Sequence, residues 1–173
     1  MTVMMKLRTY NAVKDYEYIK NWITDERMHV LWCANRIPYP VTQENFRIFM
    51  ENDAAQWGGR AYVATEDNND IPIGFFMINV NETEKSAFCK CIIVDSSVRG
   101  KGYGTGMMKL VKEFAFGELG AVIVQLNVFD ANPGAKRCYE KAGFEAESFT
   151  ADSITFGTES WGHYRMVARK ILG

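Results

Sequence analysis

The sequence predicts an α/β (α+β) fold in which helices flank both faces of a mixed, mostly antiparallel central sheet. Two observations carry this prediction. Three β-rich runs, at residues 61–65, 71–80 and 86–94, follow one another with only polar turns between them, as in an antiparallel meander. After residue 94, helical and β-rich segments alternate, which favours a sheet that is not purely antiparallel.

The first sixty residues are expected to be mainly helical. Val13, Tyr16 and Ile19 keep helical spacing, two prolines near residue 40 interrupt the pattern, and Thr42 is a natural N-cap for a helix that begins at residue 43. In chain order we expect a strand at residues 7–10 and helices at 13–23, 26–32 and 43–51.

The second half is expected to alternate between helix and strand. Asn132 before Pro133 is a helix N-cap followed by proline at the first helical position, and Gly143 supplies the left-handed residue that ends this helix. The elements expected here are a helix at 103–116, a strand at 121–129, a helix at 133–142, and strands at 144–149 and 161–169. Segment 150–159 is rich in Ser, Thr and Asp, so we expect a polar loop that could rim an acceptor cleft.

Length and composition indicate one domain, residues 1–173, of ordinary globular character. Apolar residues make up 47% of the chain and charged residues 24%, and the net charge is −1 without any block of like charge. We therefore expect no nucleic-acid partner. No apolar run approaches the ~20 residues of a membrane helix, and no signal peptide precedes the first charged residues, so no membrane partner is expected either.

The cysteines predict a reducing environment rather than a disulfide framework or a metal site. Cys89 and Cys91 stand two apart on one expected strand, where both should point to the same face and cannot pair with each other. The chain has no Cys-x-x-Cys motif and only two histidines, so we expect no metal. Reduced thiols favour a cytoplasmic location.

The segment from Arg99 to Gly106 has the composition of an anion-binding turn. Glycines 100, 102, 104 and 106 lie between an apolar strand and an amphipathic helix. Glycine lets backbone N–H groups approach an anion, and a helix N-terminus carries about half a positive charge, so the turn could hold a phosphate or pyrophosphate. A nucleotide P-loop is excluded because this segment supplies no Lys-Ser/Thr pair, and its glycines do not meet the Gly-x-Gly-x-x-Gly dinucleotide spacing.

The pattern that does fit is Arg-x-x-Gly-x-Gly, from Arg99 to Gly104, and in this the sequence resembles the GNAT superfamily of N-acetyltransferases. A second stretch, from Asn132 through Ala135 to Tyr139-Glu140-Lys141 and Gly143-Phe144, is similar to the family's second motif. The two motifs together span about a third of the chain, and the N-terminal third loosely resembles the ribosomal-protein and aminoglycoside acetyltransferase branch.

The resemblance implies a GNAT-like fold and acetyl-coenzyme A as co-substrate. It implies that one strand end pairs with the pantetheine arm and that the glycine turn holds the pyrophosphate, with Asn132 facing the pantetheine. The residues expected to bind the coenzyme are Ile92, Ile93, Val94, Arg99, Gly100, Lys101, Gly102, Tyr103, Gly104, Thr105 and Asn132. For Lys101, a solvated surface role is an equal alternative, and Asn132 is explained equally well as a cap.

Tyr139 is the candidate catalytic residue. Its helical spacing with Ala135 and Ala142 points it inward, which alone favours a core role. By resemblance, this phenol is the general acid that protonates the departing coenzyme A thiolate, and a phenol with a pKa of ~10 carries its proton at neutral pH.

The general base is left open by the sequence. Attack on a thioester needs a neutral amine, yet relatives of the ribosomal-protein branch have a glutamate base where this chain has Asn127, an amide without useful basicity. Asn127 could orient the substrate or a water, or simply be solvated. Glu82, Glu84, Asp130, His163 and a chain of waters are the alternative proton acceptors.

We therefore expect an acetyl-coenzyme A-dependent N-acetyltransferase that transfers the acetyl group directly to a primary amine of a small molecule or of a protein N-terminus. A backbone N–H at the end of the binding strand, that of Val94, would polarise the thioester carbonyl. The alternative is a coenzyme A-binding sensor or partner-binding module that has lost turnover, which the amide at Asn127 keeps open. A homodimer through edge strands is also possible.

Overall fold

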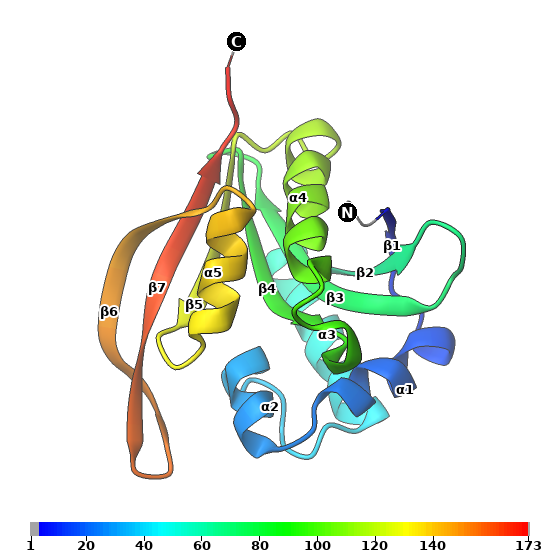
Figure 1. Ribbon diagram of the computed structural model, residues 1–173, viewed down its shortest axis with the longest axis vertical. Coiled ribbons are helices and arrows are strands. Elements are labelled where there is room, and N and C mark those ends of the chain that lie inside the picture. The colour runs from blue at the N-terminus through cyan, green and yellow to red at the C-terminus, as the bar shows by residue number, and fades with distance from the viewer. Residues whose placement is uncertain (1–3, 173) are drawn as a thin grey trace.

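Seven strands form one twisted sheet in the computed structural model, which describes residues 4–172 (Figure 1). Their order across the sheet is β1-β2-β3-β4-β5-β7-β6, and every neighbouring pair is antiparallel except β4 with β5. The strands are β1 (Met5–Thr9), β2 (Arg60–Glu66), β3 (Pro72–Asn81), β4 (Ser86–Val94), β5 (Ile123–Phe129), β6 (Glu145–Phe156) and β7 (Glu159–Arg169). The predicted mixed, mostly antiparallel sheet is confirmed.

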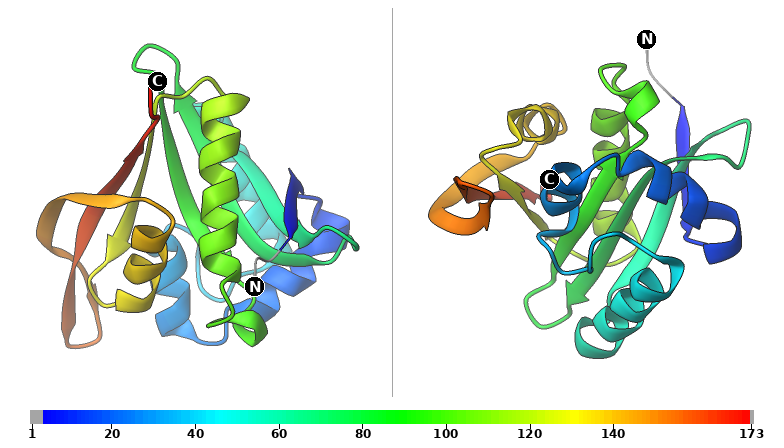
Figure 2. Two further views of the ribbon diagram at one scale, coloured as in Figure 1. Left: turned by 45° about the horizontal axis from the view of Figure 1, so that its top comes forward. Right: turned by 90° about the horizontal axis from the view of Figure 1, so that it is seen from below.

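Helices cover both faces of this sheet, as predicted (Figure 2). They are α1 (Ala12–Trp22), α2 (Glu26–Cys33), α3 (Gln43–Trp57), α4 (Tyr103–Gly117) and α5 (Pro133–Lys141), and a 3-10 turn spans Ser96–Val98. The Thr42 side chain accepts from the backbone N–H of Asn45 and the Asn45 side chain accepts from that of Thr42, which makes the predicted N-cap a reciprocal capping box. None of the described helices is long and apolar enough to cross a membrane.

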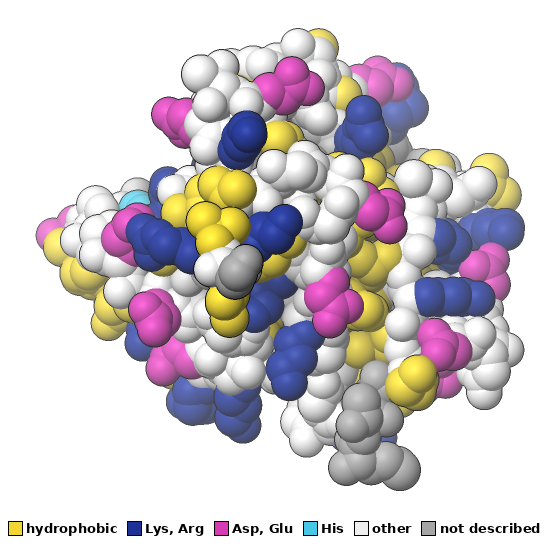
Figure 3. Space-filling view, turned by 90° about the horizontal axis from the view of Figure 1, so that it is seen from above, with side chains coloured by type: hydrophobic (Ala, Val, Ile, Leu, Met, Phe, Trp, Pro, Cys, Tyr) yellow, Lys and Arg dark blue, Asp and Glu magenta, His cyan; other side chains and the backbone are white. Residues whose placement is uncertain are grey.

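Two apolar cores result, one on each face. Residues of α4 and α5, among them Met107, Val111 and Tyr139, pack on one face. On the other, α1, α2 and α3 bury Ile19 and Phe46, together with other aromatic side chains, against the sheet. On the end of the molecule seen in Figure 3, basic and acidic side chains are interspersed without a large area of one sign.

A β-bulge in β4 reverses the side-chain alternation of that strand. Cys91 has a positive φ of 51°, and the register with β3 places Cys91 and Ile92 together opposite Phe76. The extra residue turns Cys89 into the α4–α5 core and Cys91 into the opposite core. The prediction that these two cysteines share a face was wrong, because it assumed an uninterrupted period of two.

The same bulge coincides with the point where β4 and β5 diverge. Their parallel pairing runs only from Ser86 opposite Ile123 to Cys89 opposite Leu126, although both strands continue beyond it. The indole N–H of Trp32, in α2, donates to the Cys91 carbonyl oxygen at 2.8 Å and so occupies a polar group that the bulge exposes. A gap therefore opens between two neighbouring strands in the middle of the sheet.

The C-terminal hairpin is longer than the sequence indicated. Segment 150–159 was expected to be a polar loop, but β6 continues to Phe156 and pairs with β7 up to the turn at Gly157 and Thr158. Nearly every β6 side chain is exposed, so the alternation of polar and apolar residues that marks a half-buried strand is missing there. The loop prediction was wrong for that reason.

The contribution of the hydrogen bond from Trp32 to the Cys91 carbonyl can be tested by substitution. Trp32→Phe keeps the aromatic ring but leaves the Cys91 carbonyl without its donor, and we expect the free energy of unfolding to fall by about 1–3 kcal/mol. Trp57→Phe is the control, because Trp57 is 58% exposed and should change stability by less than about 0.5 kcal/mol. Urea denaturation measures both, and equal effects would contradict the structural role given to the bond.

Candidate active site

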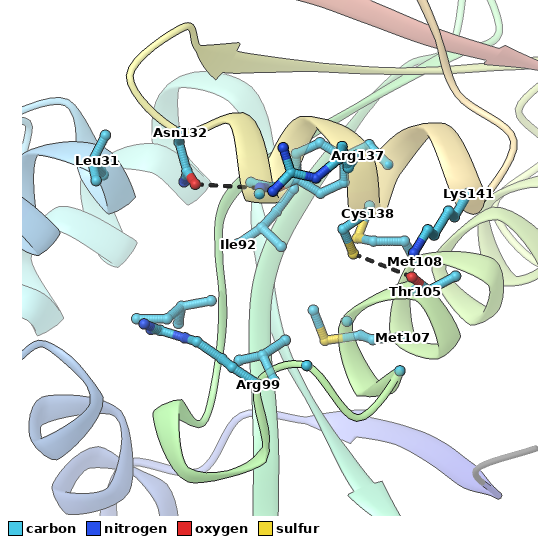
Figure 4. Close-up of a pocket in the computed structure, with 18 of the residues that line it drawn as sticks. Leu31, Ile92, Arg99, Thr105, Met107, Met108, Asn132, Arg137, Cys138 and Lys141 are labelled. Atoms are coloured by element: carbon cyan, nitrogen blue, oxygen red, sulfur yellow. Dashed lines mark hydrogen bonds between the residues drawn. The ribbon is translucent and has the colours of Figure 1, made fainter. Parts of the chain in front are cut away.

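A cavity of about 460 Å³ lies between β4, the glycine turn, α4 and α5 (Figure 4). Its walls come from α2 (Met28, Leu31, Trp32), β4 (Ile92, Ile93, Val94), the turn and α4 (Arg99, Gly100, Gly102, Gly104, Thr105, Met107, Met108) and α5 with its cap (Asn132, Gly134, Ala135, Arg137, Cys138, Tyr139, Lys141). The structure thus brings the two sequence motifs to one site, as the resemblance implied.

The glycine turn has the backbone geometry of an anion cradle. Gly100 and Gly102 have φ values of 79° and 86°, a region that side chains other than glycine rarely adopt. Gly102 is the N-cap of α4 and makes no side-chain cap, so the first-turn N–H groups of the helix remain available to a ligand. A Cβ on Gly104 would lie 3.0 Å from the Cys138 sulfur, so this glycine allows α4 and α5 to approach each other.

Three cations border this cavity. Arg99 comes from the turn, whereas Arg137 and Lys141 come from α5 on the opposite wall (Figure 4). The sequence analysis named neither Arg137 nor Lys141 as a binding candidate, although their spacing of four residues places both cations on one face of α5. These cations give the cavity the positive charge that binding of a polyphosphate ligand requires.

Two of the predicted coenzyme residues do not line the cavity. Lys101 is exposed in the turn. The Tyr103 hydroxyl donates to the Glu66 carboxylate at 2.6 Å, and this hydrogen bond raises the pKa of Tyr103 above its usual value. Their roles in coenzyme binding stay predictions, and for Tyr103 the side chain has another partner.

Asn132 and Tyr139 lie on the same helix at the edge of the cavity. The Asn132 side chain accepts from the backbone N–H of Ala135 at 3.3 Å, which confirms its role as N-cap. Tyr139 is 7% exposed, as its helical spacing predicted, and Gly143 ends the helix region with a φ of 97°. Burial raises the pKa of Tyr139 well above the ordinary value of a phenol, so its hydroxyl keeps its proton at neutral and moderately alkaline pH.

The end of β4 offers backbone groups to the cavity. The N–H of Asp95 donates to the Ile73 carbonyl in β3 at 2.8 Å. Because N–H groups alternate sides along a strand, that of Val94 faces away from β3 and into the gap beside β5. Ile92, two residues earlier, has the same orientation by this alternation, and both residues line the cavity.

A second cavity, of about 310 Å³, opens on the other side of this gap. It is lined by Leu31, Trp32, Cys33, Ala34, Arg36, Phe88, Cys89, Lys90, Cys91, Asn127, Val128, Phe129, Ser153, Ile154 and His163. Leu31 and Trp32 border both cavities. The two cavities therefore adjoin where β4 and β5 diverge.

Of the proton-acceptor candidates, His163 is the one that reaches this second cavity. Its Nδ1 lies 2.7 Å from the Ser153 hydroxyl oxygen in the facing strand β6. Glu82 and Glu84 belong to the turn that joins β3 and β4, and the Asp130 carboxylate accepts the Gly162 backbone N–H at 3.2 Å. The structure therefore separates the glutamates from the gap and brings the histidine to it.

Asn127 lines the same cavity and has a cationic partner. Its Oδ1 accepts from Arg165 Nε at 2.7 Å. Because the Asn127 carbonyl oxygen accepts from Arg165, the amide N–H groups of the same side chain point away from Arg165.

The comparisons with known proteins agree with these motifs. The acetyltransferase (GNAT) family matches residues 16–144, which is most of the chain. This chain belongs to that family. Aminoglycoside N(6')-acetyltransferases type 1 from Klebsiella pneumoniae and Serratia marcescens are each 36% identical to it over 158 residues, covering 84% of this chain and 75% of theirs.

Solved GNAT structures share the fold. Spermidine N-acetyltransferase from Vibrio cholerae, in complex with coenzyme A and spermine, superimposes with a TM-score of 0.80 at 19% identity, and the match covers 96% of both chains. The protein described here is thus an N-acetyltransferase, as the sequence predicted. Among residues 4–172, no group of three or more His, Cys, Asp or Glu side chains is placed to hold a metal ion.

Proposed function

We propose that this GNAT enzyme transfers the acetyl group of acetyl-coenzyme A directly to the primary amine of a small molecule. The observation that carries the proposal is the pair of cavities that adjoin where β4 and β5 diverge. One cavity has the features of a coenzyme site, and the other opens on the far side of the same gap. A thioester in the gap would be accessible to an amine from the second cavity.

The first cavity supports binding of the coenzyme in a defined direction. The pyrophosphate would lie on the open N–H groups of Gly102 and the first turn of α4, with Arg99, Arg137 and Lys141 around the phosphates. The pantetheine arm would pair with β4 in place of the absent β5 neighbour, as an added strand does. In this arrangement the backbone N–H groups of Ile92 and Val94 would donate hydrogen bonds to the carbonyl oxygens of the pantetheine amides and of the thioester.

Tyr139 and His163 would move the protons. The thioester carbon gains a bond to the amine nitrogen and then loses its bond to sulfur, so a proton must leave nitrogen and one must reach the thiolate. Tyr139 is on the coenzyme side and holds its proton because of burial. His163 is on the acceptor side, with Ser153 hydrogen-bonded to its ring.

A small-molecule acceptor is supported by two observations. The second cavity has a volume of about 310 Å³, which is the lower end of the range for small-ligand pockets. Relatives of this chain are named for small amines, aminoglycosides in one case and spermidine in the other.

Four free cysteines accord with the cytoplasmic location that we propose. A homodimer through the edge strands β1 and β6 stays a prediction.

The glycine cradle is tested by Gly102→Glu. A carboxylate at the α4 N-terminus would occupy the anion site and repel phosphate, so we expect the affinity for acetyl-coenzyme A to fall by about a hundredfold or more. The matched control is Gly120→Glu, because Gly120 also has a positive φ, of 71°, and open space around it. Calorimetric titration measures both variants, and equal losses would contradict the cradle.

The general acid is tested by Tyr139→Phe. We expect kcat to fall by about 10²- to 10⁴-fold while the affinity for acetyl-coenzyme A is retained, because only the phenolic hydroxyl is removed. Tyr62→Phe is the control, since Tyr62 is also 7% exposed but lines neither cavity. Because burial raises the pKa of Tyr139, we expect ionisation of this phenol to cause no alkaline decline in the wild-type rate up to about pH 10. An unchanged kcat in Tyr139→Phe would refute the assignment.

The proton acceptor is tested by His163→Gln. At neutral pH we expect kcat/KM to fall by about 10²-fold or more, and the loss to shrink as the pH approaches the pKa of the acceptor amine, ~10 for an alkylamine, where the free base is already abundant. Glu82→Gln, at the remote turn, should leave the rate unchanged. A loss in His163→Gln that is equal at pH 7 and pH 10 would point to a structural role.

A further inference from the structure

The second cavity carries positive charge and, among its lining residues, no carboxylate. Arg36, Lys90 and His163 are its titratable basic residues. An aminoglycoside or a polyamine carries several positive charges, and a site for either would be expected to offer acids. The charge of this cavity is therefore opposite to the one that the names of the relatives suggest.

Arg36 is the cation without a partner. It lies just after α2 in the chain, is exposed at the cavity mouth, and does not occur in any ion pair of residues 4–172. Its charge acts on the buried thiol of Cys91, which lines the same cavity. Burial raises the pKa of Cys91 to about 12, and the Arg36 guanidinium opposes this rise.

Lys90 is neutralised and contributes less. Its ammonium lies 2.5 Å from a carboxylate oxygen of Asp53, in α3, and both side chains are buried. Asp53 is not among the residues that line the cavity. This pair adds little net charge, so Arg36 remains the principal binding group for an anion.

A second guanidinium stands behind the cavity wall. Arg165 donates to Asn127 and lies 5.2 Å from the centre of the Phe88 ring, and it too occurs in no ion pair of the described residues. The acid nearest to Arg165 along the chain, Glu159, is paired with Arg27, and the carboxylates of Asp130 and Asp152 accept from Gly162 and Ser160.

Most of the other lining residues are apolar or aromatic, among them Phe88, Val128, Phe129 and Ile154, and the polar exceptions are Asn127 and Ser153. We propose that the acceptor is a small primary amine that also carries a carboxylate, of the class of α-amino acids with an apolar or aromatic side chain. The carboxylate binds Arg36, the apolar body contacts the aromatic walls, and the amine points to the gap between β4 and β5. This inference rests on the proposed acetyl transfer from acetyl-coenzyme A.

The test compares matched acceptors by thiol release from acetyl-coenzyme A. The panel is L-phenylalanine and L-methionine, the carboxamide of each, spermidine and kanamycin. We expect kcat/KM for each acid to exceed that for its carboxamide by about ten- to a hundredfold, the strength of a charge-assisted contact. The amine of a carboxamide is less basic and so more often neutral, which means that reactivity alone would favour the carboxamide.

Arg36→Gln locates the preference in this cavity. We expect KM for the acids to rise about tenfold or more, the acid-to-carboxamide ratio to approach one, and KM for acetyl-coenzyme A to stay constant. Arg60→Gln is the control, since Arg60 is exposed at the start of β2 and lines neither cavity.

Three outcomes would overturn the inference. A preference for spermidine or kanamycin, or an acid-to-carboxamide ratio that Arg36→Gln leaves unchanged, would refute the acceptor class while leaving acetyl transfer intact. Calorimetric binding of acetyl-coenzyme A without release of thiol for any amine would refute the proposed function as well.

Discussion

The extra residue in β4 is the constraint on which the site depends. In a regular strand β4 would continue its pairing with β5, and the middle of the sheet would be closed by hydrogen bonds. The bulge at Cys91, with its positive φ, turns the strand away after Cys89 and leaves the next backbone groups unpaired on the β5 side. Trp32 satisfies the carbonyl that this exposes. The gap that forms is the common boundary of the two cavities.

The bulge also decides which side chains reach which cavity. Beyond it the alternation is reversed, so that Lys90 and Cys91 both line the second cavity, while Ile92 and Val94 line the first cavity. Without the extra residue, Cys91 would share the α4–α5 face with Cys89. One inserted position thus sets the chemistry on both sides of the sheet.

Much of this arrangement was visible in the sequence, and the missing parts have identifiable causes. The glycine turn, the Asn132 cap and the inward Tyr139 result from local rules on turns, caps and helical spacing, which act within a few residues. The bulge does not, because residues 91 to 94 are all apolar and their alternation therefore carries no mark of a skipped position. The long exposed hairpin was missed because its pairing, rather than its pattern, makes it a strand. His163 could be named only as one of several candidates, since its position depends on contacts between distant segments.

The positive charge of the second cavity and the amide at Asn127 bear on the same step, the deprotonation of the proposed acceptor amine. The Asn127 side chain is an amide without useful basicity, so the proposed reaction needs another way to deprotonate the amine. A positive neighbour disfavours the ammonium form of a bound amine and lowers its pKa. In the proposed reaction Arg165, whose Nε donates to Asn127, would exert that influence from behind the cavity wall, and His163 would accept the proton. For a polycation this environment opposes binding, whereas an acceptor with its own carboxylate recovers the cost through Arg36. The two guanidiniums would therefore act differently on the proposed acceptor: Arg36 would bind its carboxylate, whereas Arg165 would disfavour the ammonium form of its amine.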